Sequence, residues 1–395
     1  MDNKTFKFNR MEVAGSLGDL GVLIPLGIAL VVLCKLSFSA VFLMVGIFYI
    51  ASGAYFRLPL PVQPLKVVSA VAIASPTLVN ASILSATALV FGLILLVLMA
   101  TSLIDRIAGL FSKSIVCGIQ LGLGLILIRK GLGFMMKTDL FGLTNNLTYS
   151  FQGWSPNLIL GIAGALVTLV LITNKKFPAA LVLVIAGFAI GLFFGRLSES
   201  GFSLGPTSLE IVWPTAENFL IAITLLVIPQ IPLTIGNAII GTNATAKSLF
   251  GTGIETSRVT NKSLTLSMAL ANFVIGLFGA IPLCHGAGGL AAHYRFGART
   301  GGSNIIIGSI FIIIALVFGS IGITLLTALP NAILGILLVF AGLELGMLIR
   351  VLNKKNDLFV AILIATIGFV STNMSIAFAM GIAVEYIIRF FKIEL

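Results

Sequence analysis

Apolar runs of roughly 15 to 25 residues follow one another from end to end of the chain, separated by short polar breaks. Each long run can cross a hydrocarbon core of about 30 Å as a helix. The ten-residue alternation of a membrane β-barrel is absent. We therefore expect an all-α integral membrane protein with about fourteen spans, whose ends are uncertain by several residues. The expected helices are 13–34, 37–56, 64–76, 80–102, 110–130, 157–174, 178–196, 217–241, 263–280, 286–297, 303–324, 327–350, 357–372 and 374–391.

Two of these helices, 64–76 and 286–297, are too short to cross a membrane alone. Proline-containing stretches precede them, Leu58–Pro64 and Ala280–Cys284, and proline excludes the helical conformation from its predecessor. The two helices are third and tenth of fourteen, so each is third in its half of the chain. This favours a 7+7 inverted repeat, residues 1–200 and 201–395, with a half-helix at the matching place in each half.

The composition agrees with this picture, because 58% of the 395 residues are hydrophobic and only 9% are charged. The net charge of +11 comes from basic residues scattered singly at segment ends, which indicates topology signals rather than a nucleic-acid surface. With a cytoplasmic amino terminus, eighteen of the 24 Lys and Arg lie on the cytoplasmic side and Lys66 lies within the membrane. The five on the outside are Lys35, Arg129, Lys130, Lys137 and Arg196.

We therefore expect a multi-pass protein of the cell membrane with both termini in the cytoplasm. The basic amino-terminal residues precede a long apolar run without a cleavage site, so we expect a first span rather than a signal peptide. Cys34, Cys117 and Cys284 are single thiols inside apolar runs, which indicates packing and neither a disulfide framework nor a metal site.

Asp19 is a carboxylate inside the first predicted helix, in the segment GSLGDLG. Such a residue costs about 3 kcal/mol in lipid on insertion scales, so it should face the interior of the bundle. It is a candidate for coupling or gating. A structural ion pair, or a cap on a neighbouring broken helix, is an equal alternative.

The third helix opens with Pro61-Val62-Gln63-Pro64-Leu65-Lys66. Proline is favoured in a first turn, and the free N–H groups there would point into the protein. Because the helix dipole disfavours a cation at this end, something negative should lie near Lys66. We expect Gln63, Pro64, Leu65 and Lys66 to bind substrate, and a permanent Asp19–Lys66 pair is the alternative.

Two further motifs lie in the second half. In Pro229-Gln230-Ile231-Pro232, the prolines free backbone carbonyls, and Gln230 falls near the position equivalent to Asp19. Gln230 is a binding candidate and Asn237, further along the same segment, a coupling or gating candidate; a simple kink is the alternative.

The second of these motifs, Cys284-His285-Gly286-Ala287-Gly288-Gly289, opens the tenth helix with three glycines in four positions. Such glycines suit an oxyanion resting on exposed N–H groups, although tight helix packing would also explain them. We expect His285, Gly286, Ala287, Gly288 and Gly289 to bind substrate, with His285 alternatively carrying a proton. His293, Arg295 and Arg299 lie toward the cytoplasmic end, and Arg295 is a gating candidate.

Glu344 and Glu385 are carboxylates in the twelfth and fourteenth helices. Each has a basic residue nearby toward the cytoplasm, Arg350 and Arg389 respectively. We therefore expect interfacial ion pairs.

The charges of these motifs favour an anionic cargo. Two helix N-termini are together equivalent to about one positive charge, and Lys66 raises the sum to about two, which suits a doubly charged tetrahedral oxyanion. Moving a dianion inward against 100 mV costs about 4.6 kcal/mol, so uptake needs coupling, and protons carried by Asp19 or His285 are the expected coupling ion. No nucleophile–base set or cofactor motif indicates an enzyme.

The segments GSLGDLGVLIPL, LPVQPLKVVSAVA, IPQIPLTIGNAI and CHGAGGLAAHYRFGART resemble the signature stretches of the molybdate transporter family, a relative of the sulfate permeases. The resemblance implies a core domain of spans 1–4 and 8–11, a gate domain of spans 5–7 and 12–14, and elevator-like movement. It places the anion between the starts of spans three and ten, at Gln63–Lys66 and at Ala287, Gly288 and Gly289.

The same resemblance implies secondary active import of molybdate, and it allows a homodimer. Unlike ordinary sulfate permeases, the sequence ends directly after the last span, which is taken as the lack of a carboxy-terminal regulatory domain and favours molybdate over sulfate. The residues themselves do not separate molybdate, sulfate and tungstate. A sulfate transporter, a nucleobase or other small-anion carrier on the same fold, and a channel remain the alternatives.

Overall fold

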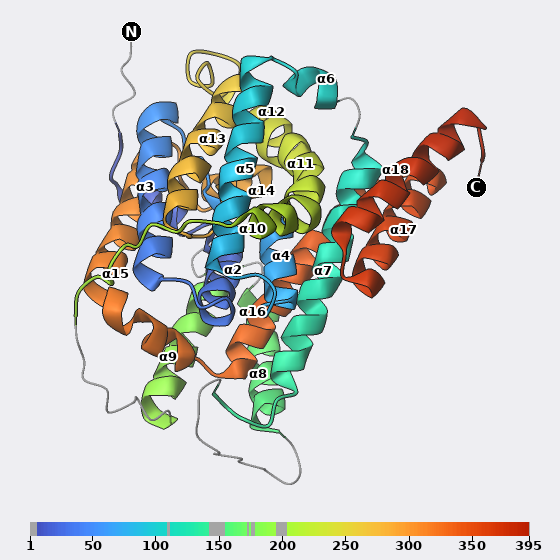
Figure 1. The fold of residues 1–395 in the computed structure, drawn as a ribbon. Coiled ribbons are helices and arrows are strands. Elements are labelled where there is room, and N and C mark those ends of the chain that lie inside the picture. Colours follow the sequence, from blue (N-terminus) through green and yellow to red (C-terminus); the bar gives the residue numbers. More distant parts are fainter. Residues whose placement is uncertain are drawn as a thin grey trace.

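Helices occupy the apolar stretches that the hydropathy pattern predicts (Figure 1). The computed structural model describes residues 6–108, 111–141, 155–171, 174, 178–194 and 204–394. The first half contains α1 (Arg10–Ser16), α2 (Leu20–Leu33), α3 (Phe38–Phe56), β1 (Gln63–Pro64), α4 (Lys66–Ala74), α5 (Ala81–Ala100), α6 (Ile104–Ala108), α7 (Lys113–Met135), α8 (Pro156–Leu171) and α9 (Ala179–Phe194). The second half contains α10 (Ala216–Ile221), η1 (Ala222–Val227), α11 (Ile228–Leu233), η2 (Thr234–Gly241), α12 (Thr242–Phe250), α13 (Asn261–Leu277), β2 (Leu283–Cys284), α14 (Ala287–Arg295), α15 (Gly302–Thr327), α16 (Asn331–Gly346), η3 (Met347–Val351), α17 (Lys355–Ser371) and α18 (Met374–Phe390).

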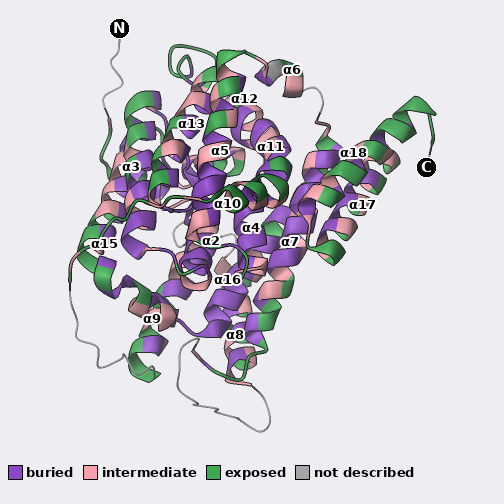
Figure 2. Ribbon diagram, in the orientation of Figure 1, coloured by how far each residue is buried: buried purple, intermediate pink, exposed green. Residues whose placement is uncertain are grey.

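The prediction of a helical, multi-pass membrane protein is confirmed. Among the described residues, six helices are long and apolar enough to cross a membrane, and the bent pair α1–α2 makes a seventh. Large apolar side chains are exposed on the outer faces of helices such as α8, α15 and α17, where lipid would cover them (Figure 2). The count of fourteen spans stays a prediction.

The first predicted span, 13–34, is broken rather than continuous. Helices α1 and α2 meet at 44°, with Leu17, Gly18 and Asp19 in the turn between them. A Cβ on Gly18 would lie 2.8 Å from the Ala292 carbonyl oxygen, so α14 crosses this turn at backbone contact. The segment around Asp19 therefore breaks the helix. The first turn of α2, with N–H groups that lack partners within the helix, then begins inside the expected span.

The two short helices are confirmed. Helices α4 and α14 each have nine residues, about 13 Å at 1.5 Å per residue, which is less than half of a hydrocarbon core. The proline-containing stretches that precede them, Leu58–Pro64 and Ala280–Cys284, are called the lead-ins below. They are extended and pair with each other in an antiparallel sheet, Gln63 opposite Cys284 and Pro64 opposite Leu283. The Leu65 N–H extends this pairing by donating to the Pro282 carbonyl at 2.9 Å.

The proline-rich eighth span is continuous, in agreement with the single helix expected at 217–241. Residues Ala216–Phe250 form one helical run in which π-helical turns, η1 and η2, flank the Pro229–Pro232 segment. Each proline removes one N–H donor, and the wider π turns let the helix continue around the missing bonds.

Glycine contacts join the long helices in antiparallel pairs. Helix α3 packs on α15, α5 packs on α13, and α7 packs on α16. A Cβ on Gly46 would lie 2.7 Å from the Gly308 oxygen, and one on Gly131 would lie 2.4 Å from the Gly335 oxygen. Such close backbone approach is the usual way in which helices associate in lipid, because only small residues permit it.

Replacing Gly46 by Ala should lower the thermal unfolding temperature of the detergent-solubilised protein. The new methyl group would meet the Gly308 oxygen and Ile312, an overpacking cost of about 1–3 kcal/mol. Gly27→Ala is the matched control, because a Cβ there meets nothing within 4 Å, and it should raise stability by about 0.5–1 kcal/mol. Equal effects of the two substitutions would contradict the α3–α15 contact.

Candidate functional site

The candidate site lies where α4 and α14 begin, in the middle of the bundle (Figure 1). Helix α4 starts at Lys66 after the N-cap Leu65, and α14 starts at Ala287 after the N-cap Gly286. Neither N-cap side chain accepts a hydrogen bond from its helix. The first N–H groups of both helices are therefore available to other partners, and the two positive dipole ends converge.

Polar side chains from α13 and the strands hold the two lead-ins in place. Asn272 donates from Nδ2 to the Leu283 carbonyl at 2.7 Å and accepts from the Leu283 N–H at 3.1 Å. The His285 ring donates from Nδ1 to the Pro61 carbonyl at 2.9 Å, and its Nε2 atom forms a hydrogen bond of 2.8 Å with the Ser267 hydroxyl. These bonds satisfy backbone groups that would otherwise be unpaired at membrane depth.

His285 thus has a structural environment. It is fully buried, its ring lies against Phe48 and Phe56, and both nitrogens are occupied. The geometry favours the role of a clamp between the two lead-ins; anion binding or proton transfer by His285 stays a prediction. Asn272 and Ser267 were missed, although a polar asparagine inside the apolar run 263–280 was a usable signal.

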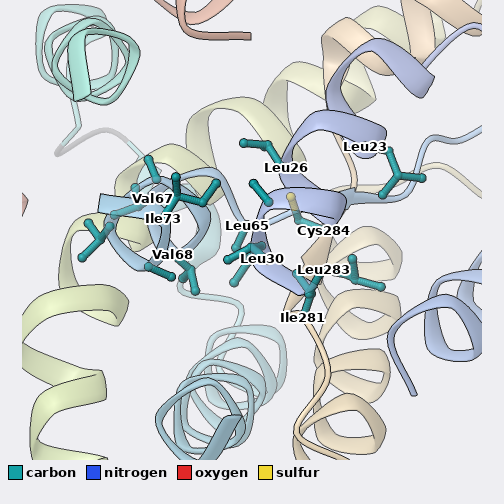
Figure 3. Packing of buried hydrophobic residues seen from close by; sticks show 14 of the residues in the cluster. Leu23, Leu26, Leu30, Leu65, Val67, Val68, Ile73, Ile281, Leu283 and Cys284 are labelled. Atoms are coloured by element: carbon teal, nitrogen blue, oxygen red, sulfur yellow. The ribbon is translucent and has the colours of Figure 1, made fainter. Parts of the chain in front are cut away.

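An apolar layer supports the site from behind. Figure 3 shows Leu26 and Leu30 of α2 close to Leu65 and to Leu283 of β2. These leucines are at most 1% exposed. Interiors of this kind are packed like crystals and resist displacement, so the lead-ins have little freedom to move relative to α2.

The carboxyl group of Asp19 and the neutral amide of Gln63 form a buried pair at the site. The Gln63 Nε2 atom donates to Asp19 Oδ1 at 2.6 Å, and both side chains are at most 3% exposed. The second oxygen of Asp19 and the Oε1 atom of Gln63 are buried without a hydrogen-bond partner. Because a buried acceptor without a donor is costly, the pair is suited to receive a proton or a donor from a ligand.

Glycine allows Asp19 to lie at the start of α14. A Cβ on Gly289 would be 2.7 Å from the Asp19 carboxyl group, and a Cβ on Gly286 would be 2.4 Å from Gln63 Oε1. The same Cβ on Gly286 would be 3.7 Å from the Asn237 amide nitrogen, so Asn237 also borders this end of the helix.

Gln230 occupies the corresponding place at α4. Its Oε1 atom accepts from the Val67 N–H at 2.9 Å, and its Nε2 atom donates to Thr234 at 3.0 Å. One N–H of the α4 first turn is therefore already occupied by the protein. Asp19, from the first half of the chain, thus lies at α14, and Gln230, from the second half, lies at α4.

Lys66 brings the only strong charge into the first turn of α4. It is 8% exposed, and its ammonium group has no hydrogen-bond or ion-pair partner in the part of the chain that the structure describes. It interacts electrostatically with Asp19 and Glu344 without forming an ion pair with either. The permanent Asp19–Lys66 pair is therefore absent from this conformation.

A cavity of about 340 Å³ opens beside the start of α14. It lies between α2 and α14 on one side and α8, α9 and α16 on the other, and its lining includes Gly18, Gly288, Arg295 and Glu344. A Cβ on Gly288 would meet nothing within 4 Å, so the backbone of α14 is open to the cavity there.

The prediction of a Glu344–Arg350 ion pair is wrong, because the structure shows no ion pair between these two residues. The predicted Glu385–Arg389 ion pair is present. Glu344 faces the cavity instead, because the six-residue spacing to Arg350 places the two side chains on different faces of the helix. Its position within an apolar run was the signal for a functional location.

The structure thus brings most candidates together, in two groups. Asp19, Gln63, Asn237, Gly286 and Gly289 adjoin one another at the start of α14. Lys66 and Gln230, with Pro64 and Leu65 before them, lie at the start of α4, whereas Ala287 begins α14, Gly288 opens to the cavity and Arg295 lines its far end.

Comparison with known proteins decides the family. The family model described as a molybdate transporter of the MFS superfamily matches residues 11–127 and 222–345, more than half of the chain. The chain belongs to the molybdate transporter family. Molybdate transporter 2 of Arabidopsis thaliana is 29% identical over 96% of this chain and 87% of its own length, and molybdate transporter 1 of Chlamydomonas reinhardtii is 28% identical over 94% and 90%.

Solved structures show the fold of this molybdate transporter family member. The transmembrane domain of the cyanobacterial bicarbonate transporter BicA has a TM-score of 0.66 at 15% identity, over 93% of this chain and 96% of that domain. SLC26A9 has a TM-score of 0.67 at 14% identity; the chain is covered to 97% but spans only 65% of SLC26A9. The fold is therefore that of BicA and SLC26A9, although the family description names the MFS superfamily. The molybdate transporter relatives are transporters rather than enzymes.

His285→Leu should lower the unfolding temperature, because it leaves the buried Pro61 carbonyl without the His285 donor, at about 1–3 kcal/mol, whereas the Ser267 hydroxyl keeps its bond to the Leu264 carbonyl. Ser267→Ala should cost less, and the double variant should show a coupling of about 0.5–3 kcal/mol in a double-mutant cycle. Unfolding of the purified protein in detergent measures all four species. Strict additivity would contradict the role of His285 as a clamp.

Proposed function

We propose that the chain is a secondary active transporter that imports a tetrahedral oxyanion, with molybdate as the principal substrate. The observation that carries the proposal is the convergence of two half-helix N-termini, neither capped by its own N-cap side chain, beside Lys66, whose ammonium group has no hydrogen-bond or ion-pair partner among the described residues. Such a place offers N–H donors and positive charge together, which is what an oxyanion requires.

The charge at this place matches a dianion. The two helix ends contribute about half a positive charge each, and Lys66 contributes one, so the sum is about two. Gly288 leaves the α14 backbone open to the cavity, and neutral Gln63 and Gln230 orient the site without cancelling its charge. An ionised Asp19 would remove half of that charge, so protonation of Asp19 should favour anion binding.

Molybdate is proposed over sulfate because of the relatives. Three curated proteins that match nearly the whole chain are named molybdate transporters, from Arabidopsis thaliana and Chlamydomonas reinhardtii. The structural neighbours are named as anion and bicarbonate transporters, and at their low identity they support the fold alone.

The helix pairs support an inverted repeat of seven and seven spans. In the proposed repeat, α3 and α13 are the second spans of the two halves, and α5 and α15 are the fourth spans. The contact of α3 with α15 therefore corresponds to the contact of α13 with α5. Helix α7 packs on α16, its own counterpart, through Gly124 with Gly342 and Gly131 with Gly335. β1 likewise pairs with its counterpart β2.

We assign spans 1–4 and 8–11 to a core domain that carries the site, and spans 5–7 and 12–14 to a gate domain. The cavity of about 340 Å³ lies between α2 and α14 of this core and α8, α9 and α16 of this gate. An elevator movement of the core along the gate would then expose the site to each side in turn. Both termini are assigned to the cytoplasm by the distribution of Lys and Arg; assembly as a homodimer stays a prediction.

Import of a dianion requires a coupled ion, since the membrane potential opposes it by about 4.6 kcal/mol at 100 mV. The proton is the proposed coupling ion, and Asp19 is the proposed carrier. Its Oδ2 atom is buried without a hydrogen-bond partner, and its Oδ1 atom lies at Gln63 and at the start of α14, close to where the anion would bind.

Lys66→Ala should weaken molybdate binding to the purified protein by about 10- to 100-fold, since a hydrogen bond to a charged group contributes about 1.5–3 kcal/mol. Lys66→Arg should keep most of the affinity, because the charge remains. Isothermal titration with molybdate, alone and with excess sulfate, measures the effect and the selectivity.

The control for this experiment is Lys354→Ala, which removes an exposed charge at the start of α17. Unchanged affinity of Lys66→Ala would move the anion away from α4. If sulfate competes as well as molybdate does, the result would still support an oxyanion site but would contradict molybdate as the preferred substrate.

Asp19→Asn should uncouple uptake from the proton gradient, because an amide cannot release a proton. In proteoliposomes, an inward pH gradient should accelerate molybdate uptake by the parent protein and not by the variant, whereas binding by the variant should persist at neutral pH. A parent protein whose uptake ignores the imposed gradient would exclude proton coupling.

A further inference from the structure

A second cavity, of about 480 Å³, lies at the opposite end of α4 from the candidate site. Its walls come from the ends of α2 and α4, the last turns of α7 and the end of α17. Ala74, the last residue of α4, lines it, whereas Lys66, the first, lies at the site. The cavity and the site are thus joined by a helix of about 13 Å.

Three cations line this cavity: Arg129, Lys130 and Lys137. None of their charged side-chain groups forms an ion pair or hydrogen bond in the part of the chain that the structure describes. Their contacts are with aromatic rings: Lys137 Nζ lies 4.6 Å and Lys130 Nζ 6.0 Å from the Phe134 ring centre, and Arg129 Cζ lies 5.8 Å from that of Phe369.

These ring contacts do not neutralise the charges. A cation over a ring gains about 0.5–1 kcal/mol at an exposed site, and here two lysines share one ring. Lys130 and Lys137 also repel each other electrostatically. No Asp or Glu is among the residues that line the cavity. The cavity therefore has a concentrated positive field without a carboxylate among the described residues that line it.

Topology signals do not explain this cluster. Arg129, Lys130 and Lys137 are three of the five basic residues that the sequence places on the outer side, where the positive-inside rule disfavours them. Three cations that the rule disfavours line one cavity, which indicates that they have a function in this cavity.

We propose that this cavity is an outer anion-binding vestibule, which holds a soluble doubly charged oxyanion before it reaches the site at the start of α4. The proposal rests on the proposed function for its direction and substrate class. A cleft lined by one sign of charge focuses the field and raises the local concentration of counter-ions by 10- to 1,000-fold. The volume exceeds that of one tetrahedral oxyanion, so the ion keeps part of its water and is held weakly enough to leave.

A cysteine at Gly133 reports the field of the vestibule without requiring transport. Gly133 lines the cavity, and a Cβ there meets nothing within 4 Å. Anionic and cationic methanethiosulfonate reagents are applied to Gly133→Cys, and their modification rates are compared. The three native cysteines are buried, and the parent protein measures their background.

The anionic reagent should react at least about 10-fold faster than the cationic one at Gly133→Cys, in proportion to the local concentration of anions. Adding R129Q, K130Q and K137Q should bring the ratio close to one. Gly253→Cys is the matched control, because it is an exposed loop glycine with open space outside this cavity, and its ratio should not respond to the three substitutions.

Molybdate at millimolar concentration should slow the modification of Gly133→Cys in a neutral detergent free of lipid. A lipid phosphate shares the chemistry of an oxyanion, so the second arm adds phosphatidylglycerol without molybdate. Protection by molybdate supports the vestibule, whereas protection by the lipid alone overturns it in favour of a headgroup site. A rate ratio that is insensitive to the three substitutions also overturns it.

Transport then links the vestibule to uptake. The triple variant should raise the external molybdate concentration for half-maximal uptake several-fold and reduce its dependence on ionic strength, with an unchanged maximal rate and unchanged Lys66-dependent binding in detergent. Loss of that binding in the parent protein would contradict the proposed function instead, so the two failures are distinguishable.

Discussion

The structure depends on a single constraint, the need to pair every backbone polar group at membrane depth. The prolines at 59, 61, 64 and 282 prevent the lead-ins from being helical, so their N–H and carbonyl groups need partners outside their own segment. The two lead-ins supply one another through β1 and β2, and Asn272 and His285 complete the pairing. That pairing places the starts of α4 and α14 side by side. A site for an anion is thus a consequence of how two broken helices satisfy their own backbones.

The two half-helices are alike in length and in their extended lead-ins, but the charges beside them differ. Lys66 and Ala287 are the first residues of the two half-helices, and only the first is charged. Asp19 lies at the start of α14 and Gln230 at the start of α4, and of these two side chains only Asp19 can ionise. Both half-helices therefore contribute backbone donors, whereas the charged groups beside those donors differ, with Lys66 at the start of α4 and Asp19 at the start of α14. Asp19 is thus a titratable group beside the place proposed for the anion.

The sequence predicted those features that follow from local chemistry. Proline spacing and short apolar runs predicted the half-helices, and the polar motifs predicted most of the residues around them. The break before Asp19 was not predictable, because it depends on the Ala292 backbone of a distant helix. The same is true of Glu344, whose direction depends on packing between α7 and α16, and of His285, whose partners Pro61 and Ser267 become neighbours only through the fold. The π turns around Pro229 show that a proline pair alone does not determine whether a helix breaks.

The two cavities lie beside the two half-helices, one along α14 next to α16 and the other where α4 ends beside α7. Their charges differ, because Arg295 and Glu344 together line the first, whereas Arg129, Lys130 and Lys137 line the second without a carboxylate. An anion is therefore concentrated at one end of the interface and meets a balanced charge at the other. Since weak binding near the exit favours release, this difference would favour capture on the outer side and release on the inner side. Direction in such a transporter would then depend on the vestibules as well as on the coupling ion.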